Sequence, residues 1–438
     1  MASRGRWTIV RDAFHRWPAL QRISLHLLDS VYVVALWPFR RQYRRETALE
    51  NGAPSSRTDE LNAAAERYFA EQRDTAYLLG KPFSDPANAA RHLIDAGVLM
   101  GAMRLRPGDV VAEIGAGTCW LSHMLNRFGC RTIAIDVSST ALALGRVLFE
   151  SDPRTNWSLQ PEFVAYDGRT IPLPADACDR IIINDAFHHV LNRRELLVEM
   201  FRVLRPDGMI AMAEPGSGHV AVAPSQAEAA TGVLETDVEI EEVESMARES
   251  GFAAVHVVAA SASVVHEVPV RRLGAFMGGS GFAAYWKQFC GSLDRHHYVV
   301  IYKGDPTPTT MRPAVLSASL QWLEPRGGGS VRLRCGEPAR VTVNVRNLGT
   351  TVWLAREGPG WTRIGVHLER SQQLLDFDWH RAALPFDVPP GGRFRLALTL
   401  PPLPSAGSYQ LVLDLVIEGH TWFAAHGSAT LGLDLEVV

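Results

Sequence analysis

Cysteine is scarce in this sequence of 438 residues, and its few copies are not spaced to bind a metal. The five cysteines lie at positions 119, 130, 178, 290 and 335, with no CxxC or CxxH pair among them. An odd, dispersed set argues against a disulfide framework and against a zinc site. We therefore expect no metal and a reducing, cytoplasmic setting.

A strong excess of one charge is also missing. The formal net charge is −3, with 21% charged and 47% hydrophobic residues, which is ordinary for a globular protein. No stripe of lysine and arginine interleaved with aromatic residues is present, so we expect no nucleic-acid partner. The length predicts two or three domains.

The first 45 residues contain no lysine and only two acids, yet they contain nine arginines. The apolar run SVYVVALWPF at 30–39 is shorter than the roughly 20 residues that span a bilayer. No small-residue cleavage site follows it, which argues against a signal peptide. Two interpretations stay open for residues 1–45: a helix at the inner face of the plasma membrane, or a basic helical cap packed on the next domain.

Strand and helix patterns alternate through the middle of the chain. Residues 59–104 are helical, and from there the patterns predict strands at 109–115, 131–137, 161–167, 178–186 and 209–215, with helices at 119–129, 139–150 and 193–208. This order predicts an α/β, Rossmann-like, mostly parallel sheet that binds ligands at the carboxyl ends of its strands.

The last part of this domain follows a different pattern. After a helix at 239–252, strands at 253–262 and 296–304 have no evident crossover helix between them, which predicts an antiparallel terminal pair. The glycine-rich insertion at 264–294 is a candidate mobile lid for an acceptor.

From about 313 onward, short alternating stretches separated by Pro/Gly turns predict an all-β sandwich. The predicted domains are a basic, Trp/Arg-rich helical segment at 1–55, an α/β domain at 56–304, a linker at 305–313 and a sandwich at 314–438.

A glycine turn carries the first chemical signal. Gly115 and Gly117 follow the first strand and open a helix, so backbone amides can approach a ligand closely. A dinucleotide fingerprint needs a third glycine where Trp120 stands, which disfavours a nicotinamide-dependent oxidoreductase. Glu113, Asp136 and Asp167 lie at three successive strand ends, where Asp136 could accept hydrogen bonds from a ribose.

Together these motifs resemble those of class I S-adenosylmethionine-dependent methyltransferases. The resemblance covers about 75–303, and it rests on EIGAGTC at 113–119, Asp136, Asp167-Gly168, NDAFHHV at 184–190 and LRPDGMIAMAEP at 204–215. It implies S-adenosyl-L-methionine as the cofactor and a set of residues that would bind it: Glu113, Gly115, Ala116, Gly117, Asp136, Val137, Asp167, Gly168, Asn184 and Asp185. Cys119, where the family has a third glycine, is expected to be a tolerated small residue.

Catalysis needs little beyond positioning, but a hydroxyl acceptor benefits from a base. His188 and His189 follow the fourth strand and are the candidates, although they could equally just shape the pocket. Tyr77 and Lys81 are further candidates near the cofactor, and Glu235 and Asp237 could reach the acceptor side.

The acceptor is suggested only by weaker resemblances. GVLE at 232–235 resembles methyltransferases of bacterial surface-polysaccharide assembly, and the tail resembles immunoglobulin-like modules on bacterial glycan-processing enzymes. The favoured acceptor is therefore a hydroxyl of a sugar, a glycolipid or a polysaccharide precursor. The alternatives are a small-molecule methyltransferase and a non-catalytic scaffold. The sandwich could bind a glycan, dock a partner or mediate a homodimer.

Overall fold

The computed structural model describes residues 55–438, apart from 265, 305, 326–329, 371–372 and 404. The predictions for residues 1–45, including membrane contact, lie outside the described residues. In the described part of the chain, no helix is both long enough and apolar enough to cross a membrane.

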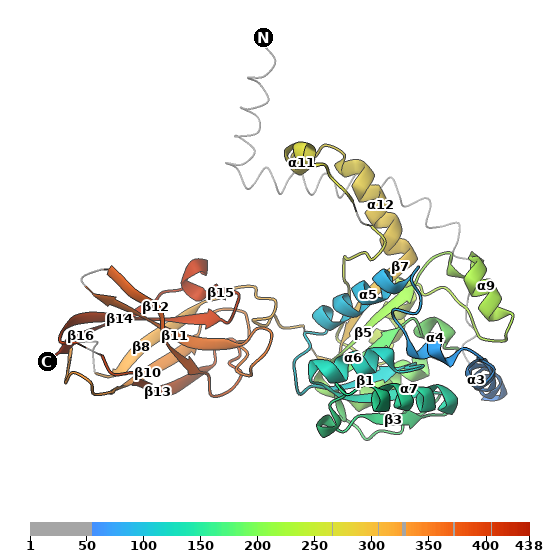
Figure 1. Cartoon of the computed structure of the whole chain (residues 1–438), viewed down its shortest axis with the longest axis horizontal. Coiled ribbons are helices and arrows are strands. Elements are labelled where there is room, and N and C mark those ends of the chain that lie inside the picture. Colours follow the sequence, from blue (N-terminus) through green and yellow to red (C-terminus); the bar gives the residue numbers. More distant parts are fainter. Residues whose placement is uncertain (1–54, 265, 305, 326–329, 371–372, 404) are drawn as a thin grey trace, which may run out of the picture. The chain divides into compact units, whose positions relative to one another are not determined.

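A seven-stranded sheet forms the centre of the α/β region (Figure 1), with the strand order β3-β2-β1-β4-β5-β7-β6. Its strands are β1 (Val110–Ile114), β2 (Arg131–Asp136), β3 (Glu162–Ala165), β4 (Cys178–Asn184), β5 (Leu204–Pro215), β6 (Ala254–Val257) and β7 (His296–Tyr302). All pairings are parallel except those of β7, which runs antiparallel to both β5 and β6. The predicted mostly parallel sheet with an antiparallel terminal pair is confirmed.

Helices cover both faces of this sheet because its strands are apolar on both sides. Ile181 and Ile183 of β4 pack in one cluster with α8 and α10, whereas Ile182 packs on the opposite face with α5 and α6. The helices that precede β6 are α3 (Ser55–Ala70), α4 (Thr75–Leu79), α5 (Ala89–Ala102), α6 (Trp120–Phe128), α7 (Ser139–Ser151), α8 (Arg193–Val203), α9 (Ala223–Ala229) and α10 (Ile240–Glu249). The carboxyl ends of β1, β2 and β4 are thereby left open to a ligand.

Two sequence-based expectations are corrected. The helix predicted at 193–208 ends at Val203, and 204–208 belong to β5, because Pro206 disfavours helix at the residue before it. No helix was expected between the last two strands, yet α11 (Val270–Met277) and α12 (Phe282–Arg295) lie there. Ser292 is the only buried residue recorded in this helical pair, and Val270 is 88% exposed.

The C-terminal region is all-β and consists of two sheets that share one hydrophobic core. One sheet has the order β13-β10-β8 and the other β12-β11-β14-β16-β9, with β15 added to β14. The strands are β8 (Ala318–Glu324), β9 (Val331–Leu333), β10 (Ala339–Asn347), β11 (Thr362–Arg370), β12 (Gln373–Ala383), β13 (Arg393–Leu400), β14 (Gly407–Ile417), β15 (Thr421–Trp422) and β16 (Leu431–Val437).

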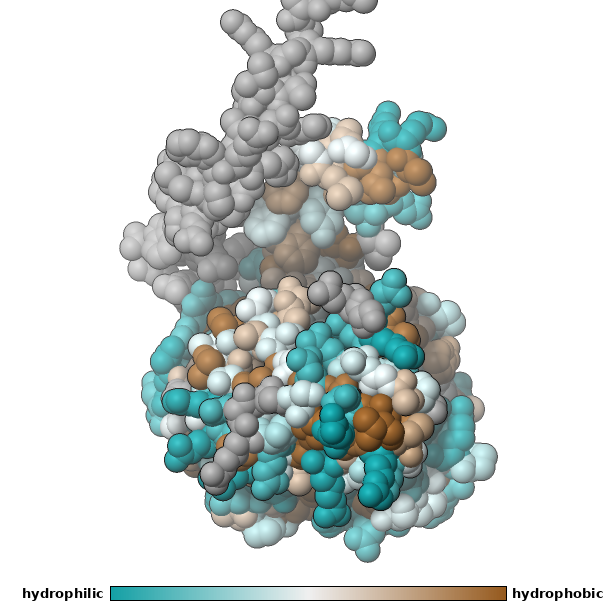
Figure 2. Space-filling model, turned by 90° about the vertical axis from the view of Figure 1, so that its left-hand side faces the viewer, coloured by the Kyte–Doolittle hydropathy of each residue, from teal (hydrophilic) through white to brown (hydrophobic). Residues whose placement is uncertain are grey.

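These sheets are compatible with the predicted sandwich, because the pairings are antiparallel except that of β9 with β16. Trp353 lies fully buried against Phe423 in their core. Hydrophobic residues gather in patches on an otherwise largely hydrophilic surface in the space-filling view (Figure 2).

Candidate functional site

A cavity of about 830 Å³ opens at the carboxyl ends of β1, β2 and β4. Its size suits a drug-sized or cofactor-sized ligand. Its floor contains the glycine turn, and its walls come from α3, α4, α5, the 3₁₀ turn Phe187–His189 and the segment around α9. This is the edge of the sheet at which the sequence predicted a ligand.

The glycine turn after β1 needs its glycines for both conformation and space. Gly115 and Gly117 have φ angles of +71° and +51°. A Cβ on Gly115 would lie 2.4 Å from the Cβ of Ala186, so this turn packs directly on the turn that follows β4. Both glycines line the cavity together with Ala116.

Two predicted acids are buried beneath this turn. Asp136 Oδ2 accepts the amide hydrogen of Gly117 (2.7 Å), and its Oδ1 accepts that of Ser138 (2.8 Å). Burial raises the pKa of Asp136, although these hydrogen bonds act to lower it. Glu113 accepts hydrogen bonds from the amide and hydroxyl of Ser122 at the start of α6, and burial raises the pKa of Glu113 to about 8. Both residues line the cavity.

The third acid is placed differently. Asp167 is exposed, and its Oδ1 accepts the amide hydrogens of Arg169 and Thr170 in the turn after β3. Gly168 lines the cavity, as does Val137, but Asp167 is not among the lining residues. Tyr166, which the sequence reasoning missed, occupies the wall beside them.

Asn184 and Asp185 end β4 at the cavity wall. Asn184 Oδ1 is buried and has no hydrogen-bond partner among the described residues. Asp185 binds Arg91 of α5 (2.9 Å). Burial acts to raise the pKa of Asp185, but the neighbouring positive charges, that of Arg91 first, together with the hydrogen bond from Arg91 lower it to about 2. Arg91 was not predicted, because nothing local in the sequence of α5 connects it to the end of β4.

His188 is held by a carboxylate that the sequence reasoning also missed. Glu214, at the end of β5, accepts the amide hydrogens of Ala186, Phe187 and His188, and its Oε2 lies 2.8 Å from His188 Nδ1. Burial would lower the pKa of His188, but the hydrogen bond and charge of Glu214 raise it. The sequence signal that could have identified Glu214 is an acid at the end of a central strand.

His189 has a different environment. Its Nδ1 lies 2.7 Å from the carbonyl oxygen of Leu234, which can only accept, so Nδ1 carries the proton and Nε2 is the basic nitrogen. Burial, followed by the neighbouring His188, lowers the pKa of His189 to about 4. His189 is therefore neutral at physiological pH, and it lines the cavity.

The outer wall is not formed by the predicted lid. No residue of α11 or α12 before Arg295 lines the cavity; instead His219, Ser225 and Glu228 around α9 do so. The reason is that α9 directly follows β5, whereas the insertion leaves the sheet between β6 and β7. Tyr77 and Lys81 line the cavity on the side of α4, as expected.

Cys119 is fully buried at the start of α6 in the left-handed conformation, with a φ of +60°. Burial raises the pKa of its thiol well above the ordinary value. A thiol in this state is a poor nucleophile, in agreement with its expected role as a small packing residue.

Comparison with known proteins agrees with this geometry. Residues 112–212 match the family model described as a methyltransferase domain. The chain is 32% identical over 107 residues to a demethylmenaquinone methyltransferase of Clavibacter sepedonicus, and the aligned stretch is 24% of this chain and 41% of that protein. It is also 30% identical over 124 residues to a malonyl-[acyl-carrier protein] O-methyltransferase of Marinomonas sp., where the aligned stretch is 27% of this chain and 43% of that protein.

The chain thus spans less than half the length of these curated relatives. Among solved structures, a SAM-dependent methyltransferase from Aquifex aeolicus has 18% identity and a TM-score of 0.35, covering 53% of this chain and 98% of that one.

The match to the methyltransferase family model supports S-adenosylmethionine as the cofactor, and the cavity fits it. This cofactor carries hydroxyl and amino donors, and the cavity wall presents acceptors to them. Two of these acceptors are buried: the Asp136 carboxylate and Asn184 Oδ1, which has no hydrogen-bond partner among the described residues. The glycine turn leaves room for close approach to the backbone.

Proposed function

We propose that the chain transfers a methyl group from S-adenosylmethionine to a hydroxyl group. The observation that carries the proposal is the cavity in which the glycine turn, Asp136 and Asn184 meet two histidines whose ring orientations are fixed. Gly115, Gly117, Asp136, Val137, Gly168 and Asn184 would hold the cofactor, with Asp136 accepting from its ribose. Glu113 would contribute to cofactor binding by holding the start of α6 through Ser122 rather than by contacting the cofactor.

When bound, S-adenosylmethionine supplies a methyl group to the acceptor oxygen as the carbon–sulfur bond breaks. The chain's own task is to align the acceptor and to take the proton that its hydroxyl loses. His189 suits that task, because it is neutral and the hydrogen bond to Leu234 leaves Nε2 as the basic atom. His188 suits it less, since Glu214 favours its protonated form.

Cofactor binding is the first test. In calorimetric titrations with S-adenosylmethionine, D136A should bind at least about tenfold more weakly than wild type, because charged hydrogen bonds contribute roughly 1.5–3 kcal/mol. D434A is the matched control, since Asp434 is exposed and lies outside the cavity lining, so that the affinity should stay unchanged. Absence of binding by the wild-type chain, or equal binding by D136A, would overturn the proposal.

For the acceptor, we propose a sugar or glycolipid hydroxyl, which rests on the sequence resemblances of 232–235 and of the tail. Transfer of labelled methyl groups into fractionated extracts tests this directly. Label in glycolipid or polysaccharide supports it, whereas label confined to small metabolites favours the small-molecule alternative. A His189→Ala variant should reduce transfer by about 10²-fold or more while binding the cofactor normally.

A further inference from the structure

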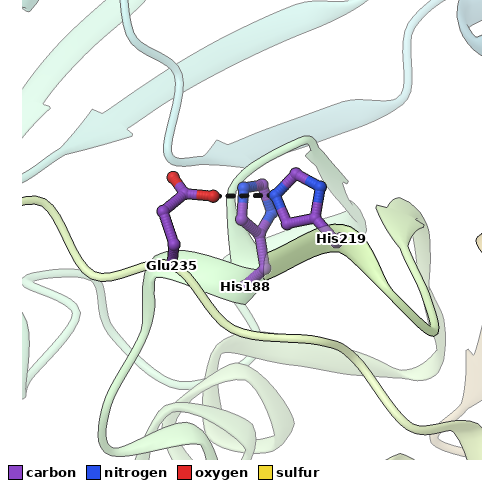
Figure 3. A group of neighbouring side chains, drawn as sticks. All are labelled: His188, His219 and Glu235. Carbon is purple, nitrogen blue, oxygen red and sulfur yellow. Dashed lines mark hydrogen bonds and ion pairs between the residues drawn. The ribbon is translucent and has the colours of Figure 1, made fainter. Parts of the chain in front are cut away.

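The acceptor side of the cavity contains a group of metal-ligating side chains that methyl transfer itself does not require. His188 comes from the turn after β4, His219 from the segment before α9, and Glu235 from the segment after it. Each offers one ligand atom, and these three atoms lie within 4.8 Å of one another. Figure 3 shows the three side chains converging from separate segments, with Glu235 and His219 in direct contact.

His188 is oriented as a metal-binding histidine commonly is. Its Nδ1 donates to Glu214 over 2.8 Å, which leaves Nε2 as the ligand atom. Glu214 is itself fixed by the amides of residues 186–188 and is fully buried. Such a carboxylate–histidine pair sets the ring orientation and raises the basicity of the ligating nitrogen.

Glu235 supplies the second, independent observation. Its side chain is 3% exposed, and its Oε2 accepts from His219 Nε2 (2.7 Å) and Ser225 Oγ (2.6 Å). Its Oε1 is buried and accepts no hydrogen bond from a fixed donor among the described residues. His189 Nδ1 lies 3.2 Å away but donates to Leu234 instead, and the carboxyl group of Glu228 lies close enough to share a hydrogen bond with Glu235. A buried carboxylate oxygen next to a second acid is costly, and a cation would satisfy it.

A second group with similar residue types differs in how its carboxylates are paired, although its His92 Nδ1 is likewise buried without a hydrogen-bond partner among the described residues. His92, Asp95 and Asp185 also lie within ligand distance of one another. Arg91 already binds both carboxylates, at 3.1 and 2.9 Å, and Tyr298 donates to Asp95. Their negative charge is therefore compensated within the chain, and this group makes a suitable internal control.

We propose that His188, His219 and Glu235 bind one divalent transition-metal cation at the acceptor end of the cavity. Two imidazoles and one carboxylate favour zinc, cobalt or manganese over magnesium or calcium, which prefer oxygen ligands alone. Three protein ligands leave a coordination position open. His188 and His219 both line the cavity, so a bound molecule can reach that position.

The role of the cation, which rests on the proposed function, is to coordinate the acceptor hydroxyl and lower its pKa. Metal binding would replace the hydrogen bond that now joins His219 Nε2 to Glu235 Oε2, because the same two side chains would ligate the cation. The sequence-based expectation of no metal considered only cysteine spacing. The ligands proposed here are separated by 31 and 16 positions in the chain and form no local motif.

The test is a calorimetric titration of the full chain with Zn²⁺ after dialysis against a chelator, together with the visible absorption spectrum of the Co²⁺ form. We expect one equivalent of Zn²⁺ to bind. H219A and the near-isosteric E235Q should weaken binding by about 100-fold, and E214Q by about tenfold. H92A, in the compensated group, should bind like wild type.

The outcomes separate this proposal from the one before it. Loss of zinc binding in H219A and E235Q, with S-adenosylmethionine still bound in a parallel titration, supports the site. No stoichiometric zinc binding by wild type, or equal binding by H219A and E235Q, overturns it, whatever the result for S-adenosylmethionine.

Discussion

A single pair of small residues decides how the glycine turn packs on its neighbouring helix. Cys119 is buried against α7, and a Cβ on Gly145 would lie 2.3 Å from Cys119 Sγ and 2.8 Å from its Cβ. A side chain at position 145 would overlap with Cys119, so only glycine fits there without a shift of the backbone. The departure from the family pattern at Cys119 is matched by a glycine in the helix that faces it.

We expect G145A to lower the free energy of unfolding by about 1–3 kcal/mol, as overpacking does, measured by urea denaturation. Removing the cysteine side chain as well, in C119G/G145A, should restore part of that loss. A G145A variant as stable as wild type would show that the two helices can move apart freely.

Glu113 makes stability depend on pH. Burial raises its pKa from an ordinary value of 4.5 to about 8, so the folded chain keeps a proton that the unfolded chain releases. The contribution of this proton to the free energy of unfolding is therefore fully present below about pH 4.5 and is lost as pH rises towards 8. E113Q retains an acceptor for Ser122 and cannot ionise. The difference in melting temperature, E113Q minus wild type, should increase from pH 5 to pH 8; a constant difference would contradict the assignment.

At the scale of elements, one carboxylate attaches α3 to α7 beside the cavity. Glu66 accepts from Ser138 Oγ (2.7 Å) and from the hydroxyl of Thr140, both at the start of α7. Leu61, Asn62 and Phe69 of the same helix line the cavity. Because α7 begins directly after Asp136 and Val137, Glu66 connects the covering helix to the cofactor floor.

E66A should therefore weaken S-adenosylmethionine binding by about tenfold, the loss expected for a charged hydrogen bond. Calorimetry measures this, and E60A is the matched control on an exposed position of the same helix. If E60A and E66A lose equal affinity, helix stability rather than the Glu66 contacts is responsible.

Glu214 connects β5 to the turn that contains both histidines. Its negative charge raises the pKa of His188, so E214Q should lower that pKa while still accepting hydrogen bonds. NMR titration of the imidazole signals measures the shift. His256, which lies outside the cavity lining, serves as the internal reference signal. An unchanged His188 pKa would show that burial alone controls it.

These elements also show what the sequence could and could not reveal. Continuous Ile and Val runs predicted the strands, and the glycines and acids at their ends predicted one edge as the site. The helical pair at 270–295 was missed because the glycines at 278, 279 and 281 interrupt its periodicity. Arg91, Glu214 and His219 were missed because they reach the cavity only through tertiary packing of separate segments.

At the scale of the molecule, the described residues form separate hydrophobic cores. The core of the β8–β16 sheets shares no residue with the clusters on the two faces of the seven-stranded sheet. Separate cores favour separate unfolding transitions. The cofactor cavity is lined by residues 58–296 alone.

Calorimetric scanning of the full chain should therefore show two transitions, of which S-adenosylmethionine shifts one. At a concentration of 100 times its dissociation constant, a ligand stabilises the fold that binds it by about 2.7 kcal/mol, which raises that melting temperature by several degrees. The other transition, from the β8–β16 sheets, should stay in place, and D136A, which binds at least about tenfold more weakly, should reduce the shift to about half or less at the same ligand concentration. One transition that moves as a whole would mean that the two regions unfold as a single cooperative unit despite their separate cores.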